Sequence, residues 1–115
     1  MNNANLSSLR ERIEIHQKQR QVSSHGYVSY AYAPSKTVWA SVIGYTATFT
    51  EGKVEDIREI RYRVIMRYEN GDIHVKDRIR YRGRMLEVTT EPVDVDGRKK
   101  YIYVNAREWV EDEKK

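Results

Sequence analysis

The sequence predicts an all-β fold, a small antiparallel β-barrel with a long central loop and a flexible N-terminal hairpin or loop. Several short segments alternate apolar and polar residues, which is the period of a half-buried strand. The aromatic residues are nine Tyr, two Trp and one Phe, a composition common in β-rich proteins. No segment carries a convincing long helix. A chain of 115 residues has room for one domain and one core, and roughly five or six short strands would pack as an antiparallel barrel or sandwich.

The N-terminal half contains three strand signals. Apolar and polar residues alternate at 13–16, and residues 37–43 are β-branched and aromatic. The third strand, at 60–68, has two distinct faces. One face is apolar and consists of Ile60, Tyr62, Val64, Met66 and Tyr68. The other face is mostly basic, with Arg61, Arg63 and Arg67.

Turn residues divide the C-terminal half. Asn70-Gly71 favours a tight reversal because both residues accept positive φ, and an alternating strand at 75–81 follows. Arg82-Gly83 then interrupts the pattern, which resumes at 84–88 and predicts a hairpin. Pro92 and Asp96-Gly97 mark the next loop, and residues 101–107 form a final strand.

Two segments resist assignment as strands. Residues 17–36 are polar, with Ser, Gly, Tyr and Pro34, and look like a long loop or a flexible hairpin. Residues 44–59 begin with a glycine, and their second half is either a short helical turn or an extension of the strand at Ile60. Loops this long in a compact domain tend to be functional or disordered.

Charge and composition suggest a soluble cytoplasmic product. The net charge is +4, and residues 60–107 carry twelve basic and seven acidic residues. The chain has no cysteine, no visible secretory signal and no apolar run that could span a membrane. We expect a single domain over residues 1–115, with a leader at 1–8 and a charged tail at 108–115 that are flexible.

The chain contains histidine, serine, aspartate and glycine residues, but they do not occur at the spacings that metal binding, catalysis or phosphate binding requires. His16, His25 and His74 have no metal-ligand spacing, and we expect all three to be ordinary surface residues. The six glycines are spread singly, so no phosphate-binding loop exists. No Ser/His/Asp arrangement is evident. The sequence therefore predicts a protein that is not an enzyme and binds no metal or cofactor.

Two basic rows are the most prominent candidate interface. One strand presents Arg61, Arg63 and Arg67, and the next presents Lys76, Arg78, Arg80 and Arg82. If the two strands pair through Asn70-Gly71, like charges lie side by side, which is unfavourable unless staggering, acids such as Glu87, water or an anionic partner offset it. The rows are a solvated outer face, a surface for an acidic protein neighbour or a surface for DNA. We expect neighbours rather than DNA, because a basic patch alone is a weak nucleic-acid signal.

In their order along the chain, these segments resemble a known family. A leader precedes Leu9–Ile15, a polar stretch leads to Val38–Val42, and a loop precedes Ile65–Tyr68. The hairpin Asp77–Arg84 and a last strand at Arg98–Val104 complete the pattern. The set resembles the phage head–tail joining proteins, also called head-closure or stopper proteins. It departs from them in carrying Tyr30 and Tyr32 where many relatives have an additional Trp.

The resemblance implies a structural subunit of the virion neck, made in the host bacterial cytoplasm and without catalytic residues. The subunit would form a homo-oligomeric ring of roughly six or twelve copies. Its partners would be the portal or adaptor on the head side, the tail or tail-completion protein on the other side, and packaged DNA passing without sequence readout. A long central loop at 44–56 would face the DNA channel. The candidate residues of this loop are Tyr45, Thr46, Thr48, Phe49, Thr50, Glu51 and Lys53.

The two tryptophans have separate expected roles. Trp39 is a candidate core anchor. Trp109, at the start of the acidic tail, is either an interface anchor or a residue at the edge of the core.

Two other functions compete with head closure. A tail-completion protein of the same neck would differ in gene order. A small barrel that binds nucleic acid directly would bind DNA tightly with a steep salt dependence.

Overall fold

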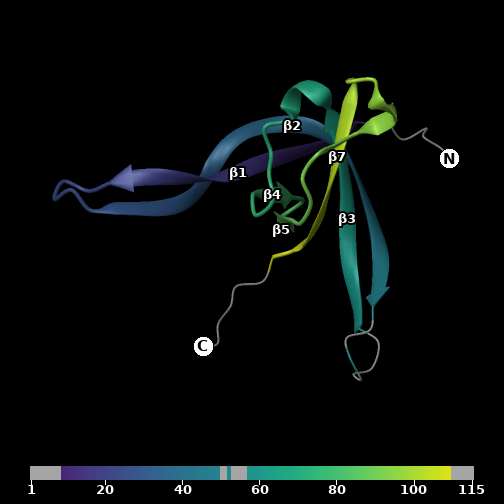
Figure 1. Ribbon diagram of the computed structural model, residues 1–115, viewed down its shortest axis with the longest axis horizontal. Coiled ribbons are helices and arrows are strands. Elements are labelled where there is room, and N and C mark those ends of the chain that lie inside the picture. Colours follow the sequence, from purple (N-terminus) through teal and green to yellow (C-terminus); the bar gives the residue numbers. More distant parts are fainter. Residues whose placement is uncertain (1–8, 50–51, 53–56, 110–115) are drawn as a thin grey trace.

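The computed structural model describes residues 9–49, 52 and 57–109. Figure 1 shows an all-β molecule with two long hairpins that leave a compact body in different directions. The elements in chain order are β1 (Glu11–Val22), β2 (Val28–Phe49), β3 (Ile57–Arg67), η2 (Tyr68–Asn70), β4 (Arg78–Tyr81), β5 (Arg84–Val88), β6 (Val93–Asp94), η3 (Val95–Gly97) and β7 (Tyr101–Glu108). Neither short helix in this described part has the length or the apolar character needed to cross a membrane.

The strands form one antiparallel sheet that closes on itself. Its order is β3-β2-β1-β4-β5-β7-β6, and an additional pairing joins β3 to β7. The hydrogen-bonded ring therefore runs through β1, β2, β3, β7, β5 and β4. The predicted all-β, antiparallel fold is confirmed, because the seven strands belong to one antiparallel sheet. Closure of the ring leaves few unpaired strand edges on the body.

Alternation along each strand fills the interior of this ring. Ile13 and Ile15 of β1 point inward, as do Val64 and Met66 of β3. The other fully enclosed side chains come from the remaining strands and the loop before β4: Ala40, Ile73, Ile79, Leu86, Val88, Val104 and Ala106. The core therefore lies where all six ring strands meet, and the alternation seen in the sequence marks its residues.

His16 departs from the expected surface position. The register of β1 against β2 shifts between Ile15 and His16, which is a β-bulge. His16 is only 8% exposed, and its imidazole is 2.8 Å from the Glu14 carboxylate. The prediction that all three histidines lie on the surface is wrong for His16, which keeps its alternate position on β1 but is buried beside Glu14.

Residues 17–36 form a hairpin rather than a loop. β1 and β2 remain paired from Gln17 with Ala33 out to Val22 with Val28. The tip is closed by Ser23, whose backbone N–H donates to the carbonyl of Tyr27 and whose hydroxyl accepts from the N–H groups of His25 and Tyr27. Gly26 supplies the positive φ that this turn requires. We call residues 17–33 the N-terminal arm.

The central segment is also mostly strand. β2 continues to Phe49 and β3 begins at Ile57, and the two pair from Ala40 with Met66 to Phe49 with Ile57. The predicted loop at 44–56 is therefore too long, and the alternative that extended the strand before Ile60 is correct. The threonines and aromatic residues at 45–49 favour this pleated ladder. We call residues 44–49 and 57–60 the second arm.

The predicted reversal at Asn70-Gly71 is wrong. Residues Tyr68–Asn70 form a 3-10 turn, Gly71 has an ordinary φ of −71°, and the chain then crosses the end of the barrel. As a result β3 does not pair with β4, whose neighbours are β1 and β5. The strand predicted at 75–81 is shortened to Arg78–Tyr81, because Lys76 adopts a φ of 80° in the turn before it. The hairpin at Arg82-Gly83 is confirmed, with φ of 49° and 80° as in a type I′ turn.

Trp39 lies outside the core. Its neighbours Val38 and Ala40 take the inward positions on β2, so the indole points outward and is 51% exposed. The guanidinium of Arg12, its cross-strand partner, lies 4.7 Å from the centre of the indole ring system. The predicted core role of Trp39 is wrong because strand alternation, and not side-chain size, decides which residues are enclosed.

Candidate functional site: a basic arm anchored on the barrel

The N-terminal arm has two chemically different faces. In the β1–β2 register Lys18 lies opposite Tyr32, Arg20 opposite Tyr30 and Val22 opposite Val28, so these residues share one side. We call this side the basic face. The opposite side carries small or uncharged residues, namely Gln17, Gln19, Gln21, Ser29, Ala31 and Ala33. The alternation of Lys, Arg and Tyr with Gln and Ala therefore separates charge and aromatic surface onto one side.

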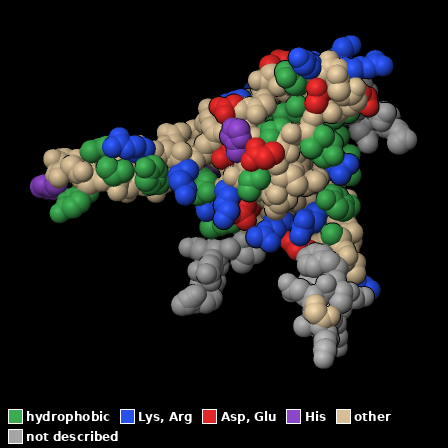
Figure 2. Space-filling model, viewed as in Figure 1, with side chains coloured by type: hydrophobic (Ala, Val, Ile, Leu, Met, Phe, Trp, Pro, Cys, Tyr) green, Lys and Arg blue, Asp and Glu red, His purple; other side chains and the backbone are tan. Residues whose placement is uncertain are grey.

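The basic face is open to solvent toward its tip. Tyr30 is 60% exposed, Tyr27 in the turn is 74% exposed, and Val22 and Val28 are also exposed. Figure 2 shows green and blue side chains, and no red ones, on the visible side of the arm. Exposed aromatic and apolar residues beside cations are typical of surfaces that bind a partner.

A stack of side chains fixes the arm to the barrel. The Tyr32 hydroxyl donates to the carbonyl of Lys76, over 2.9 Å. The Arg78 guanidinium lies 3.7 Å from the centre of the Tyr32 ring and 4.1 Å from that of Trp109. The Lys18 ammonium lies 5.9 Å from the Tyr32 ring. Arg78 is thus held between two aromatic rings, an arrangement that stabilises a cation by interaction with their π faces.

Gln17 anchors the other side of the arm. Its amide N–H group donates to the carbonyl of Asp72 and to the carboxylate of Asp77, each over 2.9 Å. Asp77 also accepts from the backbone N–H of His74. The loop between η2 and β4 therefore holds both faces of the arm at its base, through Gln17 on one side and Tyr32 on the other.

The two predicted basic rows are not neighbours. Arg63 on β3 faces Asn105 of β7, donates to its side-chain oxygen and lies 4.3 Å from the ring of Tyr103. Arg61 lies opposite Arg107, and both guanidinium groups contact Glu59. The like-charge conflict expected from pairing the rows does not arise, because β7 and β2 flank β3.

The remaining basic candidates have separate environments. Arg82 makes a bidentate ion pair with Glu11, at 3.0 and 2.6 Å, which together with smaller effects raises the pKa of Arg82. Arg80 lies 3.9 Å from Glu14. Lys76 contributes its carbonyl to the arm anchor, and Arg67 is exposed beside Trp39. Of the seven candidates, Arg78 alone belongs to the arm anchor through its side chain.

The channel-loop candidates are divided between strand and undescribed chain. Tyr45, Thr46 and Thr48 lie on β2 in the second arm and are exposed. Phe49 ends β2. Thr50, Glu51 and Lys53 lie outside the described residues.

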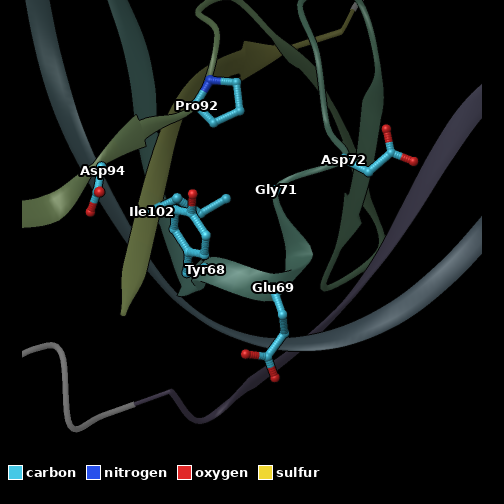
Figure 3. A pocket seen from close by; sticks show the side chains of 7 residues that line it. All are labelled: Tyr68, Glu69, Gly71, Asp72, Pro92, Asp94 and Ile102. Carbon is cyan, nitrogen blue, oxygen red and sulfur yellow. The ribbon is translucent and has the colours of Figure 1, made fainter. Parts of the chain in front are cut away.

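An acidic hollow of about 570 Å³ opens at the end of the barrel crossed by η2 and β6. Figure 3 shows Glu69, Asp72 and Asp94 around a floor of Tyr68 and Ile102. The described side chains that line it include three carboxylates and no basic group. Beside it, the Glu91 carboxylate, and to a smaller extent Asp72, raise the pKa of His74, and His74 in turn lowers the pKa of Glu91.

The exposed aromatic and basic side chains of the arm suit the binding of a partner. Among the described residues no group of three or more His, Asp or Glu is placed to hold a metal ion. Sequence reasoning missed Tyr32 as the anchor of the arm. The alternation of Lys18 and Arg20 with glutamines, and of Tyr30 and Tyr32 with alanines, is the signal that could have revealed it.

Solved structures share this fold. The solution structure of protein SF1141 from Shigella flexneri 2a aligns with a TM-score of 0.69 and 24% identity, covering 97% of this chain and 100% of that one. A chain from the virion of a native gene transfer agent particle aligns with a TM-score of 0.62 and 16% identity, covering 89% and 96%. Protein xkdH of the phage-like element PBSX from Bacillus subtilis aligns at 0.52 with 13% identity, covering 85% and 92%.

Sequence comparison gives the family. No curated protein matches the chain. The model of the phage head completion proteins matches residues 4–108, nearly the whole sequence. This match confirms the resemblance to phage head–tail joining proteins, which the order of the motifs along the chain indicated. The chain therefore belongs to the phage head completion protein family.

Proposed function

We propose that this chain forms a ring in the virion neck, between the portal or adaptor and the tail, that closes the DNA-filled head and offers the tail its attachment surface. Family membership makes the protein a structural component of the phage head–tail region. The finer role rests on its shape. A closed barrel with two projecting arms has a rigid body and two long surfaces for neighbours (Figure 1).

The observation that carries the proposal is the length of two-stranded β-structure that projects from the barrel (Figure 1). The N-terminal arm is a two-stranded ribbon, and such ribbons are marginally stable in water unless something covers them. Its anchor on Tyr32 and Gln17 sets the direction in which it leaves the barrel. A pre-oriented ribbon with an exposed aromatic face suits a subunit that becomes fully covered only after assembly.

The test is removal of the protein from the phage. A stop codon early in its gene should yield DNA-filled heads without tails and free tails, seen by electron microscopy, with packaged DNA that becomes accessible to nuclease. Supplying the wild-type gene in trans should restore infectious particles. Tailed, infectious particles at normal titre in the absence of the protein would refute the proposal.

Purified intermediates separate head closure from tail completion. Heads from a mutant that makes no tails should carry the protein, and tails from a mutant that makes no heads should lack it. The reverse distribution would assign the protein to the tail.

We further propose that the second arm faces the DNA channel, with Tyr45, Thr46, Thr48, Phe49, Thr50, Glu51 and Lys53 as the lining candidates. Thr48 is exposed on this arm and its replacement does not disturb the core. Thr48→Asp should speed the loss of packaged DNA, because a carboxylate repels phosphates, while Thr48→Lys should slow it. Equal behaviour of the two variants would place this arm away from DNA.

Direct nucleic-acid binding makes a different prediction. The isolated protein would bind DNA tightly, with affinity falling steeply as salt rises. A filter-binding titration across salt concentrations measures this. Strong, salt-sensitive binding by the single subunit would make ring closure an insufficient account of the basic surface.

A further inference from the structure

The distal basic face of the N-terminal arm and the acidic hollow lie on different parts of this subunit. Residues 17–36 contain three basic residues and no acidic residue. Around the acidic hollow, residues 68–77 and 90–100 contain six acidic and four basic residues. The described side chains that line the hollow itself include Glu69, Asp72 and Asp94 and no basic residue. The arm extends away from the barrel that carries the hollow (Figure 1). Among the residues that the structure describes, neither Lys18 nor Arg20 forms an ion pair.

We propose that the basic face of one copy docks in the acidic hollow of the next copy in the ring, so that the arm links neighbouring subunits head to tail. This inference rests on the proposed ring. The occupant of the arm surface is a second copy of this chain, and the argument for it is charge complementarity between two patches of the same sequence.

The chemistry of the two surfaces matches in more than charge. Tyr68, Pro92 and Ile102 also line the hollow, together with the three carboxylate residues. The basic face carries exposed Tyr30 and Val28 next to Arg20. Docking would cover these apolar side chains while Lys18 and Arg20 meet Glu69, Asp72 or Asp94. Aromatic anchors would supply the affinity, and the ion pairs would set orientation and rate.

Two different patches on one chain make a heterologous contact. A head-to-tail dimer leaves a free arm on one copy and a free hollow on the other. Repetition closes into a ring when the rotation allows it and otherwise gives a filament. The arm anchor of Tyr32, Arg78 and Gln17 would then set the angle between successive subunits.

Disulfide trapping in assembled particles tests the contact directly, because the chain contains no cysteine of its own. The double variant Tyr30→Cys/Glu69→Cys places one thiol on the basic face and one at the hollow. Under oxidising conditions it should give a ladder of disulfide-linked multimers on a non-reducing gel. The matched control, Ala31→Cys/Glu69→Cys, moves the first thiol to the opposite face of the arm, and should give no ladder.

Several results would overturn the inference. Infectious particles without a ladder from Tyr30→Cys/Glu69→Cys, and also from Val28→Cys/Glu69→Cys, would refute arm docking while leaving the neck function intact. A ladder of equal strength from the Ala31→Cys control would refute the assignment of the face. Dimers from Tyr30→Cys alone would indicate arm-to-arm pairing.

Charge reversal provides an independent test. Lys18→Glu/Arg20→Glu should reduce the yield of joined particles at least about tenfold, because like charges would then face each other across the contact. Glu69→Lys/Asp72→Lys should have the same effect, and joining both changes in one chain should restore assembly. If the combined variant did not assemble although circular dichroism showed that it was folded, the proposed pairing would be refuted. Loss of salt-dependent DNA binding in Lys18→Glu/Arg20→Glu would assign the face to DNA instead.

Discussion

Tyr32 should control the orientation of the N-terminal arm with little influence on the barrel. Its ring stacks on Arg78 and its hydroxyl donates to the carbonyl of Lys76. Among the described residues, Gln17 is the other side-chain anchor of the arm. Tyr32→Phe removes the hydrogen bond and keeps the stack. Tyr32→Ala removes both, so the pair of variants separates the two interactions.

The structure sets the size of each effect. An intramolecular hydrogen bond contributes about 1 kcal/mol, and a cation–π contact at an exposed site contributes about another 0.5–1 kcal/mol. Opening of the arm should therefore become roughly fivefold more frequent in Tyr32→Phe and roughly 12- to 30-fold more frequent in Tyr32→Ala. The enclosed residues of the core, such as Met66, do not contact these groups and should keep their protection.

Hydrogen–deuterium exchange of the isolated protein measures this opening segment by segment. Amides of residues 17–33 should exchange faster in both variants, in the stated order, while those of β3 and β7 should not change. Trp109→Ala should give an intermediate acceleration because Arg78 loses one of its two aromatic partners. Uniform acceleration across the whole chain, or none in the arm, would refute the anchor.

Three further outcomes follow from the fold. Ile79→Ala, in the fully enclosed core, should lower the free energy of unfolding by about 2–5 kcal/mol in urea, whereas Ile60→Ala, 56% exposed, should change it by less than about 1 kcal/mol; similar losses would mean that the core is misplaced. Gly83→Ala should cost about 1–2 kcal/mol because its φ is +80° although its Cβ would meet no atom within 4 Å; an unchanged midpoint would argue against the type I′ turn. In an NMR titration His74 should have a pKa above 6.5, and Glu91→Gln should lower it. Since the folded pKa is raised, the stabilising effect of this pair is present below pH 6.5 and is lost as the pH rises through the folded value; a midpoint insensitive to Glu91 would contradict the contact.

Local pattern was enough to predict the barrel strands. Alternation at 60–68 placed Tyr62, Val64 and Met66 on the buried face, and Arg82-Gly83 marked its hairpin, because both signals depend on the backbone and on near neighbours. The final strand at 101–107 was found for the same reason. The family followed from the order of these segments, since each motif by itself is only moderately specific.

The arms and the pairing partners could not be derived locally. Glutamine, serine and alanine at 17–33 give no apolar alternation, because neither face of that ribbon is enclosed by this subunit. Asn70-Gly71 can form a tight turn in isolation, yet Tyr68 hydrogen-bonds to Lys100 and directs the chain across the barrel end. Which strand lies beside β3 is likewise a long-range choice, so the separation of the two arginine rows appears only in the folded chain.

The position of β7 in the closed ring governs when this protein can finish folding during its synthesis. β7 is the last of the described strands in chain order, and it pairs with β3, β5 and β6. Until it emerges from the ribosome, β3 and β5 each present an unpaired edge, which is the kind of surface that recruits other chains into aggregates. A product that ends prematurely before Tyr101 would keep those edges and could not close its barrel. Synthesis of β7 is therefore a condition for a subunit that can enter the growing particle.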